Sequence, residues 1–156
     1  MELWELSARE SIRELVARYN GWGDTGRFDP MLELFAEDAV MCVPPDRVLH
    51  GREEIRALFT ATARRTGRHK GARTTLVRHF TATHQIDLQS RTTAMGRAYY
   101  LVLTDRGLDH WGRYIDEYRR VSGRWVFQRR RVTVDGRAPG AVWGEASERP
   151  RRRSRS

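Results

Sequence analysis

Apolar residues in the first half of the chain recur at the spacing of an α-helix. Between residues 7 and 20 they fall three or four positions apart, at Ile12, Leu15, Val16 and Tyr19. This pattern predicts an amphipathic helix that Ser7 caps and that ends at Gly21 and Gly23. The same reasoning predicts a short helix over 28–36, a strand over 38–43 and a third helix over 52–66.

The second half of the chain changes to the alternation of a β-sheet. It predicts four strands, over 75–88, 92–103, 109–121 and 124–134, the first of them bent near His84. Helices followed by strands indicate the α+β class, with three N-terminal helices packed on a strongly curved, antiparallel or mixed sheet. Such an arrangement encloses a pocket, which is a natural ligand site. One domain is expected over 1–143, followed by a disordered Arg-rich tail over 144–156.

Composition and charge narrow the possible functions. The chain of 156 residues is 39% hydrophobic and can bury one globular core, and it contains no long apolar run and no signal-peptide pattern. Cys42 is the only cysteine, so an intrachain disulfide is impossible and a cytoplasmic location is expected. The net charge of +9 suggests nucleic-acid binding, but much of it lies in the tail, so only non-specific binding there is expected.

No cofactor is expected from the sequence. His79 and His84 are poorly spaced to bind one metal ion from one face of a strand, and there is no cluster of cysteines and histidines. No Gly-rich loop follows a strand, so a nucleotide site is not indicated either.

The candidate chemistry begins at the end of the first helix. Tyr19 and Asp24 lie five residues apart across two glycines, and we expect both to face a pocket where they meet His79. A histidine is suited to take a proton near neutral pH, a buried aspartate can orient its ring, and a phenol can donate to developing negative charge. Each residue also has a purely structural interpretation: a buried phenol, a turn aspartate and a core histidine.

Several short motifs, in this order, resemble the SnoaL-like branch of the NTF2-like superfamily over residues 5–135. They are the stretches 24–29 (DTGRFD), 34–39 (LFAEDA), 50–55 (HGREEI), 78–80 (RHF), 112–118 (GRYIDEY) and 123–125 (GRW). The resemblance implies a cone of three helices on a curved sheet, usually in a homo-oligomer such as a dimer or trimer. The fold hosts many activities, so the fold alone does not identify the reaction.

The resemblance also suggests roles for individual residues. Tyr19, Asp24 and His79 resemble the Tyr, Asp and His of bile-acid 7α-dehydratase-type enzymes. Asp24 and His79 also resemble the Asp–His dyad of scytalone dehydratase and lindane dehydrochlorinase. The chain departs from scytalone dehydratase at the second histidine, near Thr104, and from ketosteroid isomerase at the base, where Val43 lies.

These observations predict a cofactor-independent lyase of the dehydratase type, acting on a hydrophobic, polyketide- or steroid-like small molecule. The alternatives are an isomerase or cyclase that uses the same dyad, and a non-catalytic binding module. The expected substrate-binding residues form three groups. The aromatic residues are Trp22, Phe35, Phe59, Tyr99 and Trp125, and a second group is Tyr114 and Asp116, on a strand of which either face could line the pocket. The third group is a cation on the last strand, Arg129 or Arg131, and a bulge in that strand could bring Arg130 to the pocket instead.

Overall fold

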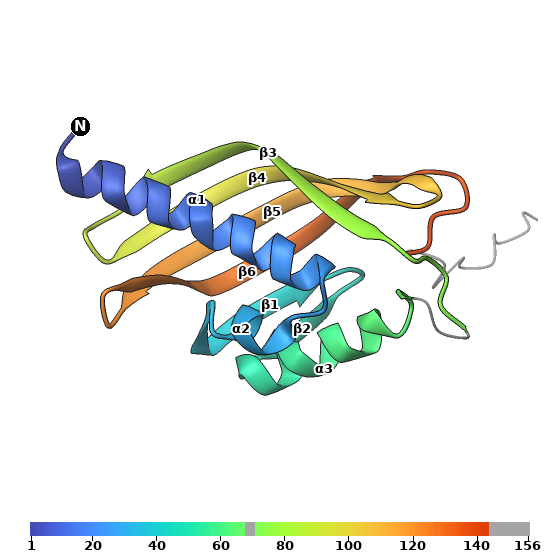
Figure 1. Cartoon of the computed structure of the whole chain (residues 1–156). Coiled ribbons are helices and arrows are strands. Elements are labelled where there is room, and N and C mark those ends of the chain that lie inside the picture. Colours follow the sequence, from blue (N-terminus) through green and yellow to red (C-terminus); the bar gives the residue numbers. More distant parts are fainter. Residues whose placement is uncertain (68–70, 144–156) are drawn as a thin grey trace, which may run out of the picture.

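The computed structural model describes residues 1–67 and 71–143, which form three helices and six strands (Figure 1). The predicted tail, 144–156, lies outside the described residues. The helices are α1 (Leu3–Asp24), α2 (Phe28–Leu32) and α3 (Gly51–Ala63). The strands are β1 (Phe35–Val43), β2 (Arg47–His50), β3 (Val77–Leu88), β4 (Thr93–Thr104), β5 (Gly107–Val121) and β6 (Arg124–Arg137).

All six strands belong to one mixed sheet. Its order is β2-β1-β6-β5-β4-β3, and every neighbouring pair is antiparallel except β1 and β6, which are parallel. Figure 1 shows α1 lying across one face of this sheet, whereas α2 and α3 lie at the end that β1 and β2 form. The α+β prediction of helices on a curved sheet is therefore confirmed. None of the helices within the described ranges is long and apolar enough to cross a membrane.

The first helix is longer at both ends than the sequence pattern predicts. It begins at Leu3, where the Glu2 amide donates to the Glu5 carboxylate at 2.7 Å, so that Ser7 lies inside the helix. It also continues through both glycines to Asp24, although each glycine weakens a helix by about 1 kcal/mol. The Thr25 hydroxyl closes this last turn by donating to the Gly21 carbonyl at 2.8 Å.

The second helix is shorter than predicted, and a strand was missed. α2 stops at Leu32 because the next residues join the sheet, where the Leu34 carbonyl accepts from the Phe127 amide at 2.8 Å. The missed strand is β2, which has only four residues and pairs with β1 alone. A strand this short carries too little alternation to be recognised from sequence.

Two irregularities change which side chains face the helices. In β3 the register shifts between Ala82 and Gln85, with Thr83 at a φ of 53°, which confirms the predicted bend and turns His84 to the inner face. Regular alternation would place His84, five residues after His79, on the opposite face of the strand, and the bulge reverses this. In β6 the register shifts opposite Glu117 and Tyr118, and this shift turns Arg130 inward.

Arg130 is the largest fully buried side chain in the described residues, and it forms an ion pair with Asp116. Its Nε and Nη2 atoms donate to the two carboxylate oxygens at 2.9 and 2.7 Å. The Tyr118 hydroxyl donates to the same carboxylate at 2.8 Å. Burial opposes the charge of Arg130, but Asp116 outweighs this effect, so the pKa of the guanidinium is raised.

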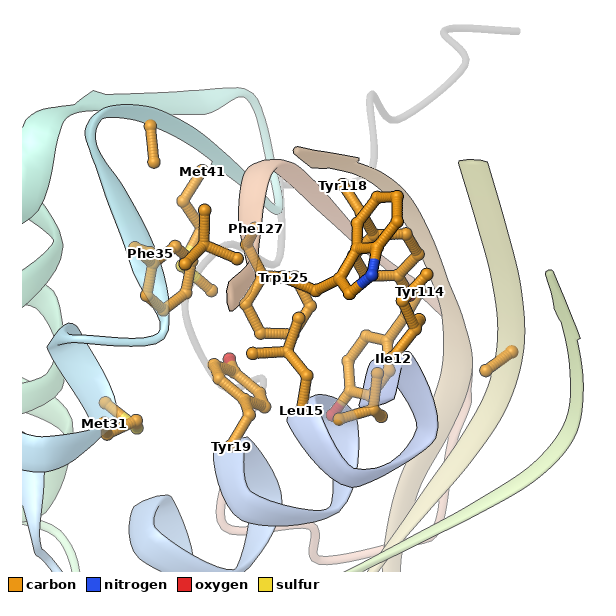
Figure 2. Packing of buried hydrophobic residues seen from close by; sticks show 14 of the residues in the cluster. Ile12, Leu15, Tyr19, Met31, Phe35, Met41, Tyr114, Tyr118, Trp125 and Phe127 are labelled. Carbon is orange, nitrogen blue, oxygen red and sulfur yellow. The ribbon is translucent and has the colours of Figure 1, made fainter. Parts of the chain in front are cut away.

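Aromatic rings surround this ion pair. The guanidinium carbon lies 4.2, 4.0 and 4.1 Å from the ring centroids of Tyr19, Tyr114 and Phe127. In Figure 2, α1 contributes Tyr19 to the cluster, and the sheet contributes Tyr114 and Phe127. Desolvated cation–π contacts contribute about 2 kcal/mol each, which helps to offset the cost of burying the charge.

We predict that Asp116→Ala lowers the free energy of unfolding by about 3–5 kcal/mol, because it leaves the Arg130 charge buried without a counterion. Urea denaturation followed by circular dichroism measures this change. The control is Asp135→Ala, which breaks the exposed pair with Arg113 and should cost at most about 1 kcal/mol. Equal losses in the two variants would contradict the structural role of the buried pair.

Candidate active site

A cavity of about 460 Å³ lies between the C-terminal end of α1, α3 and the inner face of the sheet. Its wall is mainly apolar and comes from both helices and strands, with Phe28, Met41, Leu58, Phe59, Val77, Val102 and Val132 among the lining residues. A cavity of this size is in the range that small-molecule sites occupy. The three predicted catalytic residues, Tyr19, Asp24 and His79, all line it.

Asp24 and His79 form a hydrogen-bonded pair in this wall. The Asp24 Oδ1 atom lies 2.5 Å from His79 Nδ1, and Oδ2 accepts from the His79 backbone N–H at 2.9 Å. The Asp24 side chain is 7% exposed and that of His79 is 27% exposed, so the carboxylate is enclosed while the ring reaches the cavity. Both carboxylate oxygens are thus used to hold one histidine.

The place of Asp24 in the fold explains this geometry. Asp24 is the last residue of α1, and a carboxylate near a helix C-terminus is disfavoured by about 0.3–1 kcal/mol. The backbone N–H and the ring of His79 supply compensating donors from β3. When Nδ1 carries the hydrogen that Asp24 accepts, the Nε2 lone pair of neutral His79 is left to act on a ligand.

The neighbours of Tyr19 are mainly aromatic side chains. Its ring makes edge contacts with Phe35, Phe59, Tyr114 and Phe127, at centroid distances of 5.6–6.1 Å. Burial raises the pKa of its phenol, although the nearby Arg130 partly offsets this effect. The hydroxyl therefore stays protonated near neutral pH and keeps its ability to donate a hydrogen bond.

A polar chain beside Tyr19 was not predicted. The Tyr114 hydroxyl donates to Asn20 Oδ1 at 3.2 Å, and Asn20 Nδ2 donates to the Thr81 hydroxyl at 2.5 Å. Asn20 is 7% exposed and lines the cavity. Its position directly after Tyr19, at the buried end of the helical pattern, was the available sequence signal.

A second histidine–aspartate pair also faces the cavity. His110 Nδ1 lies 2.7 Å from Asp109 Oδ2, and His110 lines the cavity. His110 pairs with Val102 of β4, which in turn pairs with His79, so the two histidines lie on one face of the sheet, on the strands to either side of β4. Tyr100 lies near both rings, at centroid distances of 6.3 Å to His79 and 5.8 Å to His110.

Asp109 also holds the segment that follows β6. Its carboxylate accepts from the backbone amides of Val142 and Trp143, and its carbonyl accepts from the Ala138 amide. Trp143 lines the cavity and lies 6.3 Å from the His110 ring between centroids. This one carboxylate therefore positions both a histidine and part of the cavity wall.

The expected substrate-binding residues separate into two groups. Phe59 and Tyr114 line the cavity, whereas seven others lie elsewhere: Trp22, Phe35, Tyr99, Asp116, Trp125, Arg129 and Arg131. Phe35 and Trp125 fill the core, and Trp22 packs against it. Asp116 is bound to Arg130, and Tyr99 is 56% exposed on the outer face. Arg129 and Arg131 are exposed because the shift in β6 turns Arg130 inward instead.

His84 remains outside the cavity although it shares the inner face of β3. Its Nε2 atom lies 3.3 Å from the Tyr118 hydroxyl, and burial lowers the pKa of its imidazole. Within residues 1–67 and 71–143 there is no group of three or more His, Cys, Asp or Glu side chains that could hold a metal ion. The expected homo-oligomer stays a prediction.

Comparison with known proteins identifies the family and the fold of this chain. A model of the SnoaL-like domain matches residues 4–131. No curated protein matches the sequence. A putative scytalone dehydratase from Novosphingobium aromaticivorans is 21% identical, with a TM-score of 0.74, over 88% of this chain and 91% of that one. A type 2 hexachlorocyclohexane dehydrochlorinase (LinA) is 17% identical, with a TM-score of 0.75, over 88% of this chain and 92% of that one.

A third solved structure comes from a protein of unknown function. It is a cystatin-like fold from Nostoc punctiforme that is 23% identical, with a TM-score of 0.71, over 85% of this chain and 92% of that one. At these identities the three structures establish a common fold only. The family model covers most of the chain, so the protein belongs to the SnoaL-like family and has the NTF2-like fold.

We predict that His110 titrates below the ordinary histidine pKa of 6.5, because burial lowers its pKa more than Asp109 raises it. NMR titration of the ring resonances, assigned with His110→Gln, measures this value. Below pH about 6.5 the unfolded chain then binds a proton at His110 before the folded protein does, so stability falls. Arg137→Gln should raise the pKa, because the Arg137 charge helps to lower it. A His110 pKa above 6.5 in the wild type would contradict this account.

Proposed function

We propose that this SnoaL-like protein is a cofactor-independent lyase that removes a small leaving group, such as water, from a hydrophobic molecule. The observation that carries the proposal is the Asp24–His79 pair, in which Asp24 Oδ1 lies 2.5 Å from Nδ1 of a histidine on the wall of an apolar cavity. A histidine held in this way can act as a general base. The elimination requires only proton transfers and the loss of the leaving group.

His79 takes the proton in the proposed reaction. Its Nε2 lone pair removes a proton from the carbon next to the one that carries the leaving group. The electrons of that C–H bond form a C=C bond, and the leaving group departs with the electrons of its own bond. Asp24 accepts from Nδ1–H throughout and stabilises the imidazolium that forms. The backbone N–H of His79 fixes the second carboxylate oxygen, so the ring and the carboxylate keep their relative orientation.

Tyr19 is proposed to assist the leaving group or the substrate carbonyl. Because burial keeps the phenol protonated, it can donate a hydrogen bond to a departing hydroxide or to an oxygen that gains negative charge. The proton that His79 acquires returns to solvent or to the departing hydroxide, so the enzyme regains its starting state. His79 is the base, Asp24 orients it, and Tyr19 is the donor.

The cavity supports a hydrophobic substrate of the polyketide or steroid type. Phe28, Phe59 and Tyr114 offer flat apolar surfaces, and a volume of about 460 Å³ suits a molecule with few rings. Two structural relatives, a putative scytalone dehydratase and a hexachlorocyclohexane dehydrochlorinase, are named for elimination reactions. This likeness supports the reaction class and does not identify the substrate.

The first test measures the base directly. We predict that the protein accelerates exchange of the α-protons of a bicyclic ketone such as 2-tetralone in D₂O, and that His79→Gln reduces this rate by about 10²–10⁴-fold. NMR follows the loss of the α-proton signal. His84→Gln is the matched control, because His84 lies on the same face of β3 outside the cavity, and it should leave the rate unchanged. Equal rates in wild type and His79→Gln would exclude the proposed base.

A second candidate function is isomerisation, and the His110–Asp109 pair favours it. An isomerase moves a hydrogen between two carbons and needs a group at each end of the path. His79 and His110 line one cavity from strands on either side of β4, and each has Nδ1 beside a carboxylate. Because burial lowers the pKa of His110, its ring is neutral near pH 7 and can accept a proton that it later returns.

His110→Gln distinguishes the two reactions. For an isomerase of an unsaturated bicyclic ketone we predict that His79→Gln abolishes α-exchange, whereas His110→Gln preserves α-exchange and slows double-bond migration by about 10²-fold or more. Ultraviolet absorbance of the conjugated product and NMR measure the two steps. No double-bond migration by the wild type, together with release of water from a β-hydroxy ketone, would favour the lyase. Wild-type protein that binds these ketones but catalyses neither double-bond migration nor release of water would favour the binding module.

A further inference from the structure

A second hollow of about 730 Å³ adjoins the cavity of the proposed active site. The two spaces share six lining residues: Leu58, Thr62, Tyr100, His110, Val132 and Trp143. The shared wall includes His110, so a molecule that extends from the first space into the second passes one of the two histidines. The hollow is large enough to hold the polar end of such a molecule.

The charges on the wall of this hollow all have one sign. Its charged lining residues are Arg47, Arg65 and Arg137, and no Asp or Glu side chain of the described residues lines it. None of these three arginines forms a salt bridge with another described residue. In the first cavity, by contrast, the lining carboxylate of Asp24 is already bound to His79.

The arginines come from separate parts of the fold that meet at this hollow. Arg47 begins β2, Arg65 follows α3, and Arg137 ends β6, where it pairs with His110 of β5. Burial lowers the pKa of His110 and raises the pKa of Tyr100; the Arg137 charge adds to the first effect and opposes the second, which supports its closeness to the shared wall. The three side chains are exposed, so they can move onto a ligand without first breaking an ion pair.

We propose that the hollow is an oxyanion-binding subsite and that the substrate is amphipathic, with a hydrophobic body and a carboxylate or phosphate at one end. The inference rests on the proposed function, because it assumes that the body occupies the first cavity. Guanidinium groups bind both anions through paired N–H donors. The arginine cluster also attracts anions to the opening before they bind.

This subsite would set the direction in which the substrate enters. With its anion at the arginines, the hydrophobic body passes Tyr100 and His110 and reaches His79 in the first cavity. A neutral molecule of the same shape would lack this constraint. Binding should therefore depend on ligand charge, and the dependence should weaken as salt screens the exposed arginines.

Isothermal titration calorimetry with two ligands of matched shape tests the proposal. We predict that 2-naphthoate binds about tenfold or more tightly than neutral 2-naphthamide at low salt, because three exposed guanidinium groups each add a modest attraction for the carboxylate. The ratio should fall as salt is raised. 2-Naphthyl phosphate provides a further arm, because whichever of the two anions binds more tightly identifies the preferred oxyanion.

The triple variant R47Q/R65Q/R137Q should bind naphthoate and naphthamide within about twofold of each other, with its naphthamide affinity unchanged. The control R97Q/R124Q/R131Q removes the same charge from exposed arginines that line neither space, and it should keep the wild-type ratio. The inference is overturned if wild-type protein binds the two ligands equally, if salt does not change the ratio, or if the first triple variant keeps it.

His79→Gln separates this inference from the proposed reaction. It removes the base but none of the three arginines, so it should lose α-proton exchange and keep the preference for naphthoate. Preference without exchange in the wild type would reject the enzymatic function and leave the subsite. Exchange without preference would reject the subsite and leave the enzyme.

Discussion

The buried contact between Arg130 and Asp116 is the constraint on which the inner face of the sheet depends. A charged pair in a core is costly, and here both carboxylate oxygens accept from the guanidinium, although Arg130 Nη1 has no hydrogen-bond partner among the described residues. The rings of Tyr19, Tyr114 and Phe127 then pack around the cation. This cluster fills the space behind Tyr19, while the part of the inner face that carries His79 and His110 remains open as a cavity.

The same cluster relates the core to the candidate site. Tyr19 contacts Arg130 on one side and lines the cavity on the other, and five residues later α1 ends at Asp24, which binds His79 of β3. The helix is thus attached to the sheet by packing at Tyr19 and by hydrogen bonds at Asp24. These two attachments fix the distance between the phenol, the carboxylate and the imidazole, which is the kind of preorganisation that general acid–base chemistry requires.

The sequence was informative where side chains keep a regular period and where a motif has fixed spacing. Tyr19, Asp24 and His79 could be brought together because helical spacing and family motifs agreed. Arg129 and Arg131 were misplaced because one extra residue in β6 inverts the faces after it, and no local pattern marked that residue. His110 was overlooked because its importance comes from pairing across β4 and from Asp109, contacts that only the folded sheet creates. Phe35 and Trp125 are aromatic residues of the kind that line ligand pockets, but the structure places them in the core.

The bonds from Asp109 to the amides of Val142 and Trp143 have an evolutionary consequence. Backbone amides bind this carboxylate whichever side chains their residues carry, so the segment after β6 can change sequence while it stays anchored. Trp143 reaches the cavity from that segment, whereas Asp24 and His79 come from elements that α1 and the sheet hold in place. Substitutions at position 143 can therefore reshape the cavity wall without disturbing the Asp24–His79 pair.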